Sequence, residues 1–229
     1  MITNGPAGGR RLQLAAGEAH VWVADLDAVG PHRLDLLSAD ERRRAAAIIS
    51  EDARRRWARG RGLLRSLLGG YLGDDPGGLL LERDPNGKPR LLDHRAGAPS
   101  FNLSHSGHLA LYAFAPEGSV GIDLQLPRGK IDDLALAARA LGPETAETLR
   151  ALDPAGRRSA FLRAWTRHEA VLKWRGGGIG APIPAGGPEP WVTDLPLSGE
   201  PAAALALDSE PARLLVRSVG EPGLGSAFP

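Results

Sequence analysis

The 229-residue sequence predicts an α+β fold that is built from two similar lobes. In each half, a strand-like segment that contains an aspartate precedes a short capped helix, and a longer helix rich in arginine and aromatic residues follows. Sparse similarities recur at a constant spacing, as between Leu37 and Leu141 or Trp57 and Phe161, which is typical of a weak internal repeat. We therefore expect an N-terminal lobe over residues 1–116 and a C-terminal lobe over residues 117–229, with a ligand cleft between them.

The composition narrows the class of protein. Hydrophobic residues make up 42% of the chain, and the formal net charge of +1 gives no general reason to expect nucleic acid or an anionic membrane as a partner. The absence of cysteine excludes disulfides and thiolate metal sites. No apolar run has the length of a transmembrane helix, and the N-terminal segment has no apolar stretch of signal-peptide length. We therefore expect a cytoplasmic protein that binds neither nucleic acid nor membranes.

The N-terminal lobe begins with a predicted strand and two predicted helices. Apolar and polar residues alternate over residues 19–27, which predicts a half-buried strand. Ser38 and Glu41 have the spacing of a capping box, in which each side chain satisfies a free backbone N–H group at a helix start. A longer helix is predicted over residues 53–72, because leucines recur there at helical spacing until Gly73 ends the pattern.

The remaining elements follow the same signals. Two apolar runs flank the turn sequence at residues 85–87 and predict a hairpin with Lys88 at its mouth. A helix that includes residues 161–174 continues the second lobe. Strands are predicted over residues 109–114, 120–124, 191–195, 203–207 and 214–219, and a disordered tail over residues 220–229.

Glu169 has an unexpected position on the helix of the second lobe. At 100° per residue it lies between Trp165 and Leu162, on the face that should be buried. A buried carboxylate without a partner is costly, so it must take up a proton or find a cation. The alternative is an ordinary exposed pair between Glu169 and Lys173 at i+4, which is worth only about 0.3–0.5 kcal/mol.

Asp123 raises the same question on a strand. It shares one strand face with Gly121 and Gln125, while the apolar Ile122 and Leu124 share the other face. Taken alone, Asp123 is better explained as a strand-end residue that caps a turn. Together with a second carboxylate on an inward helix face, it predicts a Mg²⁺ site that water and substrate phosphates complete.

The segment "NLSHSGH" supplies groups that suit an anion. Ser104, His105, Ser106 and Gly107 can present hydroxyl, imidazole and backbone N–H groups, and His105 can transfer a proton or bind phosphate. One alternative is a zinc site formed by His105 and His108, although no third ligand has a recognisable spacing. Another alternative is a polar turn without a function.

Several basic residues can form a phosphate-binding rim if they converge on the cleft, although the simpler explanation is a solvated surface. They are Arg44, Arg55, Arg59, Lys88 and Lys173. With the two carboxylates they predict Mg²⁺-assisted chemistry on a phosphorylated small molecule.

The order of four motifs resembles a known family. "GKP" at residues 87–89, "FNLSHSG" at 101–107, "GID" at 121–123 and "FLRAWTRHEAVLKWRGGGI" at 161–179 are similar to the signature blocks of the two-lobed, surfactin-type 4′-phosphopantetheinyl transferases. The resemblance covers residues 21–179. Because four motifs occur in the same order and spacing, it is specific.

The resemblance implies a monomer of two pseudo-symmetric lobes, each a small antiparallel sheet packed with helices, with coenzyme A bound between them. It also implies the reaction. The phosphopantetheine arm of coenzyme A moves to a serine of an acyl or peptidyl carrier protein, and adenosine 3′,5′-bisphosphate is released. Carriers of this type present an acidic helix beside the serine, so local basic and apolar surface near the cleft should matter more than the net charge.

The resemblance further implies a role for each site residue. Asp123 would hold Mg²⁺, and Glu169 would share the metal and take the proton from the incoming serine. Lys173 would neutralise the transferring phosphate. The phosphates of the coenzyme would be held by Ser104 and His105, and its 3′-phosphate side by Lys88, Arg55 and Arg44.

Two positions depart from the usual pattern of the family. Many members carry glutamate where this chain has Gln125, so the amide would offer its carbonyl oxygen to the metal or hold a metal-bound water. His168 replaces the usual lysine before the glutamate, and it can either tune Glu169 or merely pack. Two other functions are compatible with the same residues: a metal-dependent phosphohydrolase of coenzyme A or a nucleotide, and a non-catalytic module that binds coenzyme A or a carrier.

Overall fold

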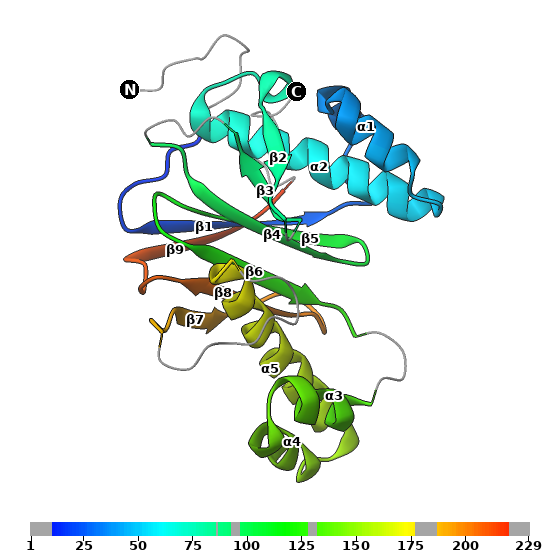
Figure 1. Cartoon of the computed structure of the whole chain (residues 1–229), viewed down its shortest axis with the longest axis vertical. Helices are drawn as coiled ribbons and strands as arrows, with labels where there is room; N and C mark the ends of the chain where they lie inside the picture. Colours follow the sequence, from blue (N-terminus) through cyan, green and yellow to red (C-terminus); the bar gives the residue numbers. More distant parts are fainter. Residues whose placement is uncertain (1–10, 86, 93–96, 128–131, 177–186, 220–229) are drawn as a thin grey trace.

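The computed structural model describes residues 11–85, 87–92, 97–127, 132–176 and 187–219, and it forms four layers (Figure 1). From one side to the other, these are a long helix, a four-stranded sheet, a three-stranded sheet and a second long helix. The elements in chain order are β1 (Glu18–Asp25), η1 (Pro31–Leu36), α1 (Ala39–Ala46), α2 (Glu51–Leu72), η2 (Pro76–Gly78), β2 (Leu81–Arg83), β3 (Pro89–Leu91), β4 (Ser100–Ser106), β5 (Leu109–Ala115), β6 (Val120–Gln125), α3 (Asp133–Ala140), α4 (Pro143–Arg150), α5 (Pro154–Trp174), β7 (Trp191–Asp194), β8 (Ala202–Leu207) and β9 (Arg213–Ser218).

The first sheet is buried on both faces, because adjacent residues of its central strands serve two different cores. Trp22 of β1 and Tyr112 of β5 are register partners whose side chains pack against α2 with Leu64. The next pair in the register, Val21 and Ala113, points to the opposite face and packs against the second sheet. The alternation of side chains along each strand therefore places one sheet between a helix layer and another sheet.

The α+β class is confirmed, and the first sheet contains one strand that the division into lobes did not anticipate. Its strand order is β4-β5-β1-β9, and β9 pairs with β1 in parallel. The second sheet is antiparallel, with the order β6-β8-β7. The first sheet is therefore mixed, because a strand from the C-terminal part of the chain adds to its edge. A lobe boundary at residues 116/117 remains a prediction.

The predicted helix signals are present, and one capping residue, Glu41, has a second role. Ser38 and Glu41 form both hydrogen bonds of the capping box, and Gly73 ends α2 in the left-handed conformation. Glu41 is also buried and pairs through its two carboxylate oxygens with Arg61 and Arg65, at 2.6 Å each. One carboxylate therefore caps α1 and neutralises two buried guanidinium groups of α2.

Other predictions at this level have mixed outcomes. The hairpin is present as β2 and β3, and the strands predicted in the last third of the chain are present as β7, β8 and β9. In the segment that we considered as a polar turn, residues 104–106 belong to the strand β4, and Gly107 lies in the turn that follows it. The predicted disordered tail, residues 220–229, lies outside the described residues. No helix within the described ranges is long and apolar enough to cross a membrane.

A buried polar network joins β1 to α2. The hydroxyl of Tyr71 lies 2.8 Å from Nδ1 of His20 and accepts a hydrogen bond from Nε1 of Trp22 at 2.9 Å. Nε2 of His20 lies 3.5 Å from Glu18. Burial lowers the pKa of His20 from its usual 6.5, and nearby Arg217 lowers it further, while Glu18 partly opposes the shift. The folded protein therefore favours the neutral imidazole.

We predict that this histidine makes the fold less stable in mild acid. Because its pKa is lower in the folded state, the unfolded chain binds the proton more readily below pH 6.5. The contribution of His20 to the free energy of unfolding is complete above pH 6.5. It is lost as the pH falls towards the lowered pKa of His20 in the folded state, at a rate of at most about 1.4 kcal/mol per pH unit. Urea denaturation between pH 7 and pH 5 should show a smaller pH dependence for His20→Gln than for the wild type. Parallel pH profiles would contradict the prediction.

Candidate active site

Three side chains of β4 connect the two sheets at a seam with β6. Asn102 donates to the backbone oxygen of Val120 at 3.0 Å, and Ser104 donates to Oδ1 of Asp123 at 2.8 Å. Ser106 accepts from the N–H group of Leu126 at 3.0 Å. All three lie on one buried face because side chains alternate along a strand. The polar pattern of "FNLSHS" therefore joins the two sheets, and only Ser104 also reaches a charged site residue.

A glycine allows α5 to lie directly against β6. A Cβ atom on Gly121 would lie 1.9 Å from the backbone oxygen of Ala170 and 2.5 Å from the nitrogen of Trp174, far inside van der Waals contact. The close approach brings Glu169 and Lys173, one helical turn apart, over Asp123. Glu169 is only 5% exposed and Asp123 only 3%. The helix and the strand therefore bring two carboxylates together away from bulk water.

Lys173 is bound to the strand and not to the glutamate of its own helix. Its ammonium group lies 2.7 Å from Oδ1 of Asp123 and donates to Ser104 Oγ and to the backbone oxygen of Ile122, each at 3.0 Å. The expected alternative of an exposed pair between Glu169 and Lys173 is therefore wrong. A lysine on the helix reaches the strand because Gly121 permits the close approach.

The buried carboxylate of Glu169 differs from that of Asp123, which pairs with Lys173. Among the described residues it has no hydrogen-bond or ion-pair partner. Burial raises the pKa of Glu169, and the neighbouring charge of Asp123 raises it further, while Lys173 partly offsets both effects. A carboxylate with a raised pKa accepts a proton more readily than an ordinary glutamate.

The donor set fits a divalent cation whose shell is completed from outside the protein. Asp123 and Glu169 supply two carboxylates, and the amide of Gln125 lies beside them, with Nε2 3.4 Å from Oδ2 of Asp123. The described residues contain no group of three or more acidic or histidine side chains that could hold a metal. Hard cations such as Mg²⁺ commonly bind through one or two carboxylates together with water and substrate phosphates. Two close, buried carboxylates beside one lysine suit that pattern.

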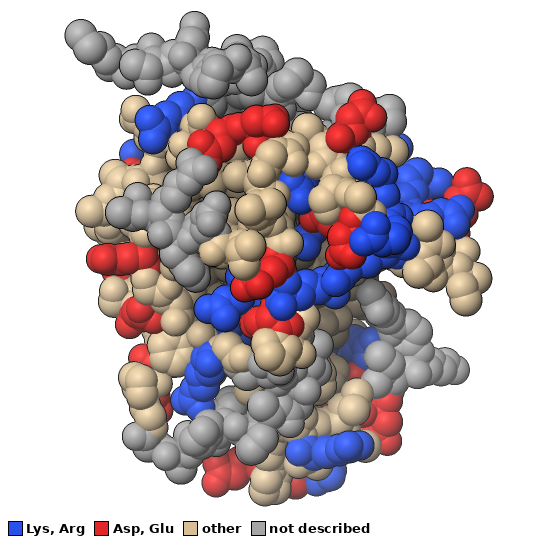
Figure 2. Space-filling model, turned by 45° about the horizontal axis from the view of Figure 1, so that its top comes forward, with Lys and Arg blue, Asp and Glu red and all other residues tan. Residues whose placement is uncertain are grey.

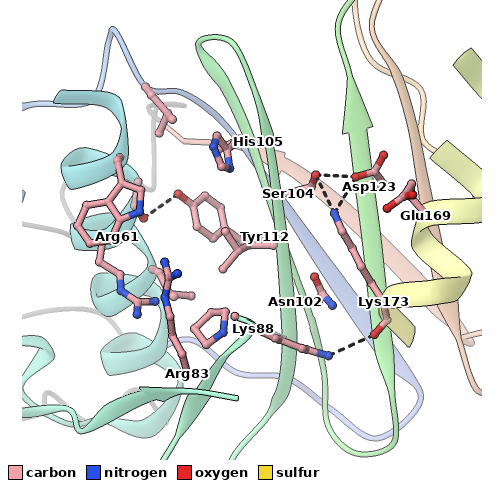
Figure 3. Close-up of a pocket in the computed structure, with 18 of the residues that line it drawn as sticks. Arg61, Arg83, Lys88, Asn102, Ser104, His105, Tyr112, Asp123, Glu169 and Lys173 are labelled. Carbon is pink, nitrogen blue, oxygen red and sulfur yellow. Dashed lines mark hydrogen bonds and ion pairs between the residues drawn. The ribbon is translucent and has the colours of Figure 1, made fainter. Parts of the chain in front are cut away.

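These residues line one cavity of about 410 Å³ between the two halves of the chain (Figure 3). Ser104, Asp123, Glu169 and Lys173 lie on one side, and Arg61 and Arg83 lie on the other. The cavity brings together the predicted residues Lys88, Ser104, His105, Asp123, Gln125, Glu169 and Lys173.

Lys88 connects the hairpin to the other half of the chain. Its ammonium group donates to the backbone oxygen of Val120 at 3.3 Å and to that of Lys173 at 3.5 Å. Burial lowers the pKa of Lys88, while Asp84 partly opposes the shift. This lysine therefore holds the end of α5 and the start of β6 at the cavity wall.

Arg44 and Arg55 are not among the residues that line the cavity. Arg44 pairs with Asp40 at 3.0 Å and Arg55 with Asp52 at 2.7 Å, each along its own helix surface. Three other arginines line the cavity instead, namely Arg56, Arg61 and Arg83. The sequence contained a signal for one of them, because Arg61 lies on the same helical face as the buried leucines of α2. The same helical signal singles out Glu169 on α5.

The two histidine questions have different outcomes. His105 lines the cavity, and no zinc-type cluster is found within the described ranges, so the zinc alternative has no support there. His168 is half-buried and does not line the cavity, and burial lowers its pKa. Its position favours packing over a direct role.

Comparison with known proteins identifies similar chains along most of the sequence. Residues 119–216 match the family model described as "4'-phosphopantetheinyl transferase superfamily", and residues 31–117 match "4'-phosphopantetheinyl transferase, N-terminal". The chain is 42% identical to the 4′-phosphopantetheinyl transferase HetI of Nostoc sp. over 172 residues, which cover 73% of each protein.

Two further relatives are more distant. A putative 4′-phosphopantetheinyl transferase of Synechocystis sp. is 34% identical over 71% of this chain and 66% of the relative. A 4′-phosphopantetheinyl transferase of Bacillus subtilis is 30% identical over 64% of this chain and 69% of the relative.

Substitution by glutamine should change protein stability in opposite directions at the two buried glutamates, Glu41 and Glu169. The buried environment disfavours the ionised form of Glu169, so Glu169→Gln should raise the free energy of unfolding and the Tm at pH 7. The gain should vanish in acid, once Glu169 is protonated in both the folded and the unfolded state. Glu41→Gln should lower stability by about 3–5 kcal/mol, because it leaves two buried guanidinium groups without their counter-ion. Thermal denaturation of both variants tests the contrast, and a destabilised Glu169→Gln protein would refute it.

Proposed function

Because the chain belongs to the 4′-phosphopantetheinyl transferase superfamily, we propose that it transfers the 4′-phosphopantetheine group of coenzyme A to a serine of a carrier protein. The acceptor is an acyl or peptidyl carrier protein, and adenosine 3′,5′-bisphosphate is the second product. The observation that carries the proposal is the convergence of Asp123, Glu169 and Lys173 at one end of a cavity that basic residues line.

The reaction replaces one phosphorus–oxygen bond with another. The serine oxygen bonds to the phosphorus that carries pantetheine, and the bond from this phosphorus to the bridging anhydride oxygen breaks. The hydroxyl proton must leave, since serine is a poor nucleophile at neutral pH and needs a positioned base. Glu169 is the base in this proposal, because its raised pKa and its lack of a partner among the described residues favour proton uptake.

Lys173 and Ser104 are proposed to stabilise the phosphate during transfer. The lysine ammonium lies 3.0 Å from the serine hydroxyl, and both groups donate to Asp123, so each would exchange that contact for a phosphate oxygen when the coenzyme binds. A cation and a hydroxyl that are already positioned lower the cost of the negative charge that develops on the leaving group. We also propose His105 as a ligand of the coenzyme phosphates, because it lines the same cavity.

We propose Mg²⁺ as the cofactor, held by Asp123 and Glu169, with the carbonyl oxygen of Gln125 or a water beside it as the third ligand. When bound, the metal would neutralise the pyrophosphate and its leaving oxygen. The support is the pair of buried carboxylates beside a single lysine, which together leave net negative charge where a pyrophosphate has to bind. Direct titration of Mg²⁺ into the wild type and Gln125→Glu, without a carrier, should show tighter binding for the variant.

The 3′-phosphate end of coenzyme A is assigned to Lys88, Arg61 and Arg83. Lys88 retains its predicted role, while Arg61 and Arg83 replace Arg44 and Arg55, which pair with carboxylates of their own helices. Arg61 shares Glu41 with Arg65, so the cluster keeps surplus positive charge beside the cavity. A multiply charged anion that binds there is neutralised by these basic side chains, so it does not have to bring a cation with it.

We extend the proposal to the oligomeric state, the location and the partners of the protein. A single chain supplies every proposed site residue, which supports a monomer. We propose a cytoplasmic location for this protein, with no nucleic acid or membrane partner. Phosphohydrolysis is less well supported than transfer, because no relative that we compared carries a hydrolase name.

Mass spectrometry of carrier proteins tests the function. A panel of apo carriers incubated with coenzyme A and Mg²⁺ should include members that gain the mass of one phosphopantetheine. Glu169→Gln should lower turnover at least 100-fold while remaining folded, since proton transfer by a positioned base contributes about 10²–10⁴-fold. Phosphopantetheine released to solvent without a carrier would indicate hydrolysis. Binding of coenzyme A without any turnover would indicate the non-catalytic module.

A pair of arginine variants tests the revised phosphate contacts. Arg83→Gln should raise KM for coenzyme A about five- to tenfold, because a charge-assisted contact to the 3′-phosphate is lost. With dephospho-coenzyme A, which lacks that phosphate, the variant should resemble the wild type. Arg55→Gln, the matched control, should leave KM for both substrates unchanged. The reverse ranking would restore Arg55 to the site.

A further inference from the structure

The connection between α1 and α2 exposes an isoleucine completely. Ile49 is 99% exposed, whereas the next most exposed large hydrophobic residue in the described part of the chain, Leu80, is 56% exposed. Burying such a side chain is worth about 1.5–3 kcal/mol, so this position forgoes a large stabilisation. The fold does not require isoleucine here, because Ser50 caps α2 and the backbone N–H group of Ile48 bonds to Ala45.

The surface around this residue is strongly basic. Residues 39–61 contain eight arginines and four carboxylates, although the whole chain has a net charge of only +1. Of the four carboxylates, Asp40 is shared by Arg43 and Arg44, Asp52 pairs with Arg55, and Glu41 is buried, whereas Glu51 is exposed. Figure 2 shows Lys and Arg side chains gathered over the end of the molecule where α1 and α2 lie, with a band that continues across the face.

The start of α2 connects Ile49 to the cavity wall. Arg56 and Trp57, in the second turn of α2, already line the cavity. Ile49 lies two residues before α2 begins at Glu51, and Arg56 lies five residues after Glu51, or about 8 Å along a helix that rises 1.5 Å per residue. A partner helix of three to four turns, about 20 Å long, can span the distance from the exposed isoleucine to the cavity mouth.

We propose that the docking surface for the carrier protein is formed by Ile49 and the arginines of α1. Among these arginines, Arg43 stays largely exposed although it pairs with Asp40. The inference rests on the proposed function, which requires a protein to bring its serine to the cavity. The surface fits an acidic helix that carries an apolar residue, because charge complementarity steers association and a central apolar contact supplies affinity. A small anion cannot reach both the cavity and Ile49, and nucleic acid would leave the isoleucine in water.

The test compares two exposed pairs on different parts of the molecule. Ile49→Ser and Arg43→Gln change the proposed surface. Leu152→Ser and Arg150→Gln change a similar pair on α4 and the residues after it, where Arg150 also pairs with a carboxylate three residues away, as Arg43 does. Transfer to an apo acyl carrier protein that the wild type modifies is measured at several salt concentrations, and coenzyme A binding is measured separately by calorimetry.

Ile49→Ser should lower kcat/KM for the carrier about five- to tenfold, and Arg43→Gln should lower both kcat/KM and its salt dependence. Coenzyme A affinity should not change, and the control pair should match the wild type. Unchanged carrier kinetics for Ile49→Ser, or an equal loss in the controls, would overturn the docking surface. So would tight binding of single-stranded DNA that Arg43→Gln abolishes while carrier transfer persists. A wild type that modifies no carrier would instead overturn the proposed function.

Discussion

The seam between β4 and β6 is the constraint on which the site depends. In the part of the chain that the structure describes, no backbone ladder joins β4 to β6, and three side chains of β4 form hydrogen bonds across this edge. One of them, Ser104, bonds to Asp123, and Lys173 closes the group from α5. Beside the apolar core between the sheets, a contact that joins the two halves thus also orients a site carboxylate. A chain with this arrangement cannot separate its lobes without dismantling its candidate active site.

Two buried glutamates illustrate how the same residue type serves stability and function. Glu41 satisfies a helix cap and two arginines, so its charge is compensated within the fold. Glu169 is placed on an equally buried helix face without such a partner among the described residues, and the environment resists its ionisation. The fold therefore gives up stability at one position and retains it at the other. Unpaired buried charge is expected where chemistry requires a group to change its protonation state.

The sequence predicted the local elements and the central site residues, because each depends on a short pattern. Helix caps, turn signals and the helical position of Glu169 are readable within a few residues. Features that depend on distant partners were missed. The pairing of β9 with β1 joins segments almost 200 residues apart, and the polar residues of β4 have a clear role only beside β6. The cavity is lined by Arg61 of α2 and Arg83 of β2 and not by Arg44 or Arg55, which likewise depends on how distant segments fold together.

The parallel pairing of β1 with β9 bears on how the protein is made. On the ribosome, β1 emerges early, but its edge stays unpaired until residues 213–218 have been synthesised. Contacts of such large sequence separation form slowly, and exposed strand edges promote association between nascent chains. The cavity wall formed by β4 and β5 belongs to the same sheet. The candidate site residues therefore precede the strand that completes their sheet, and a nascent chain that stalls before β9 would present them without a finished sheet behind them.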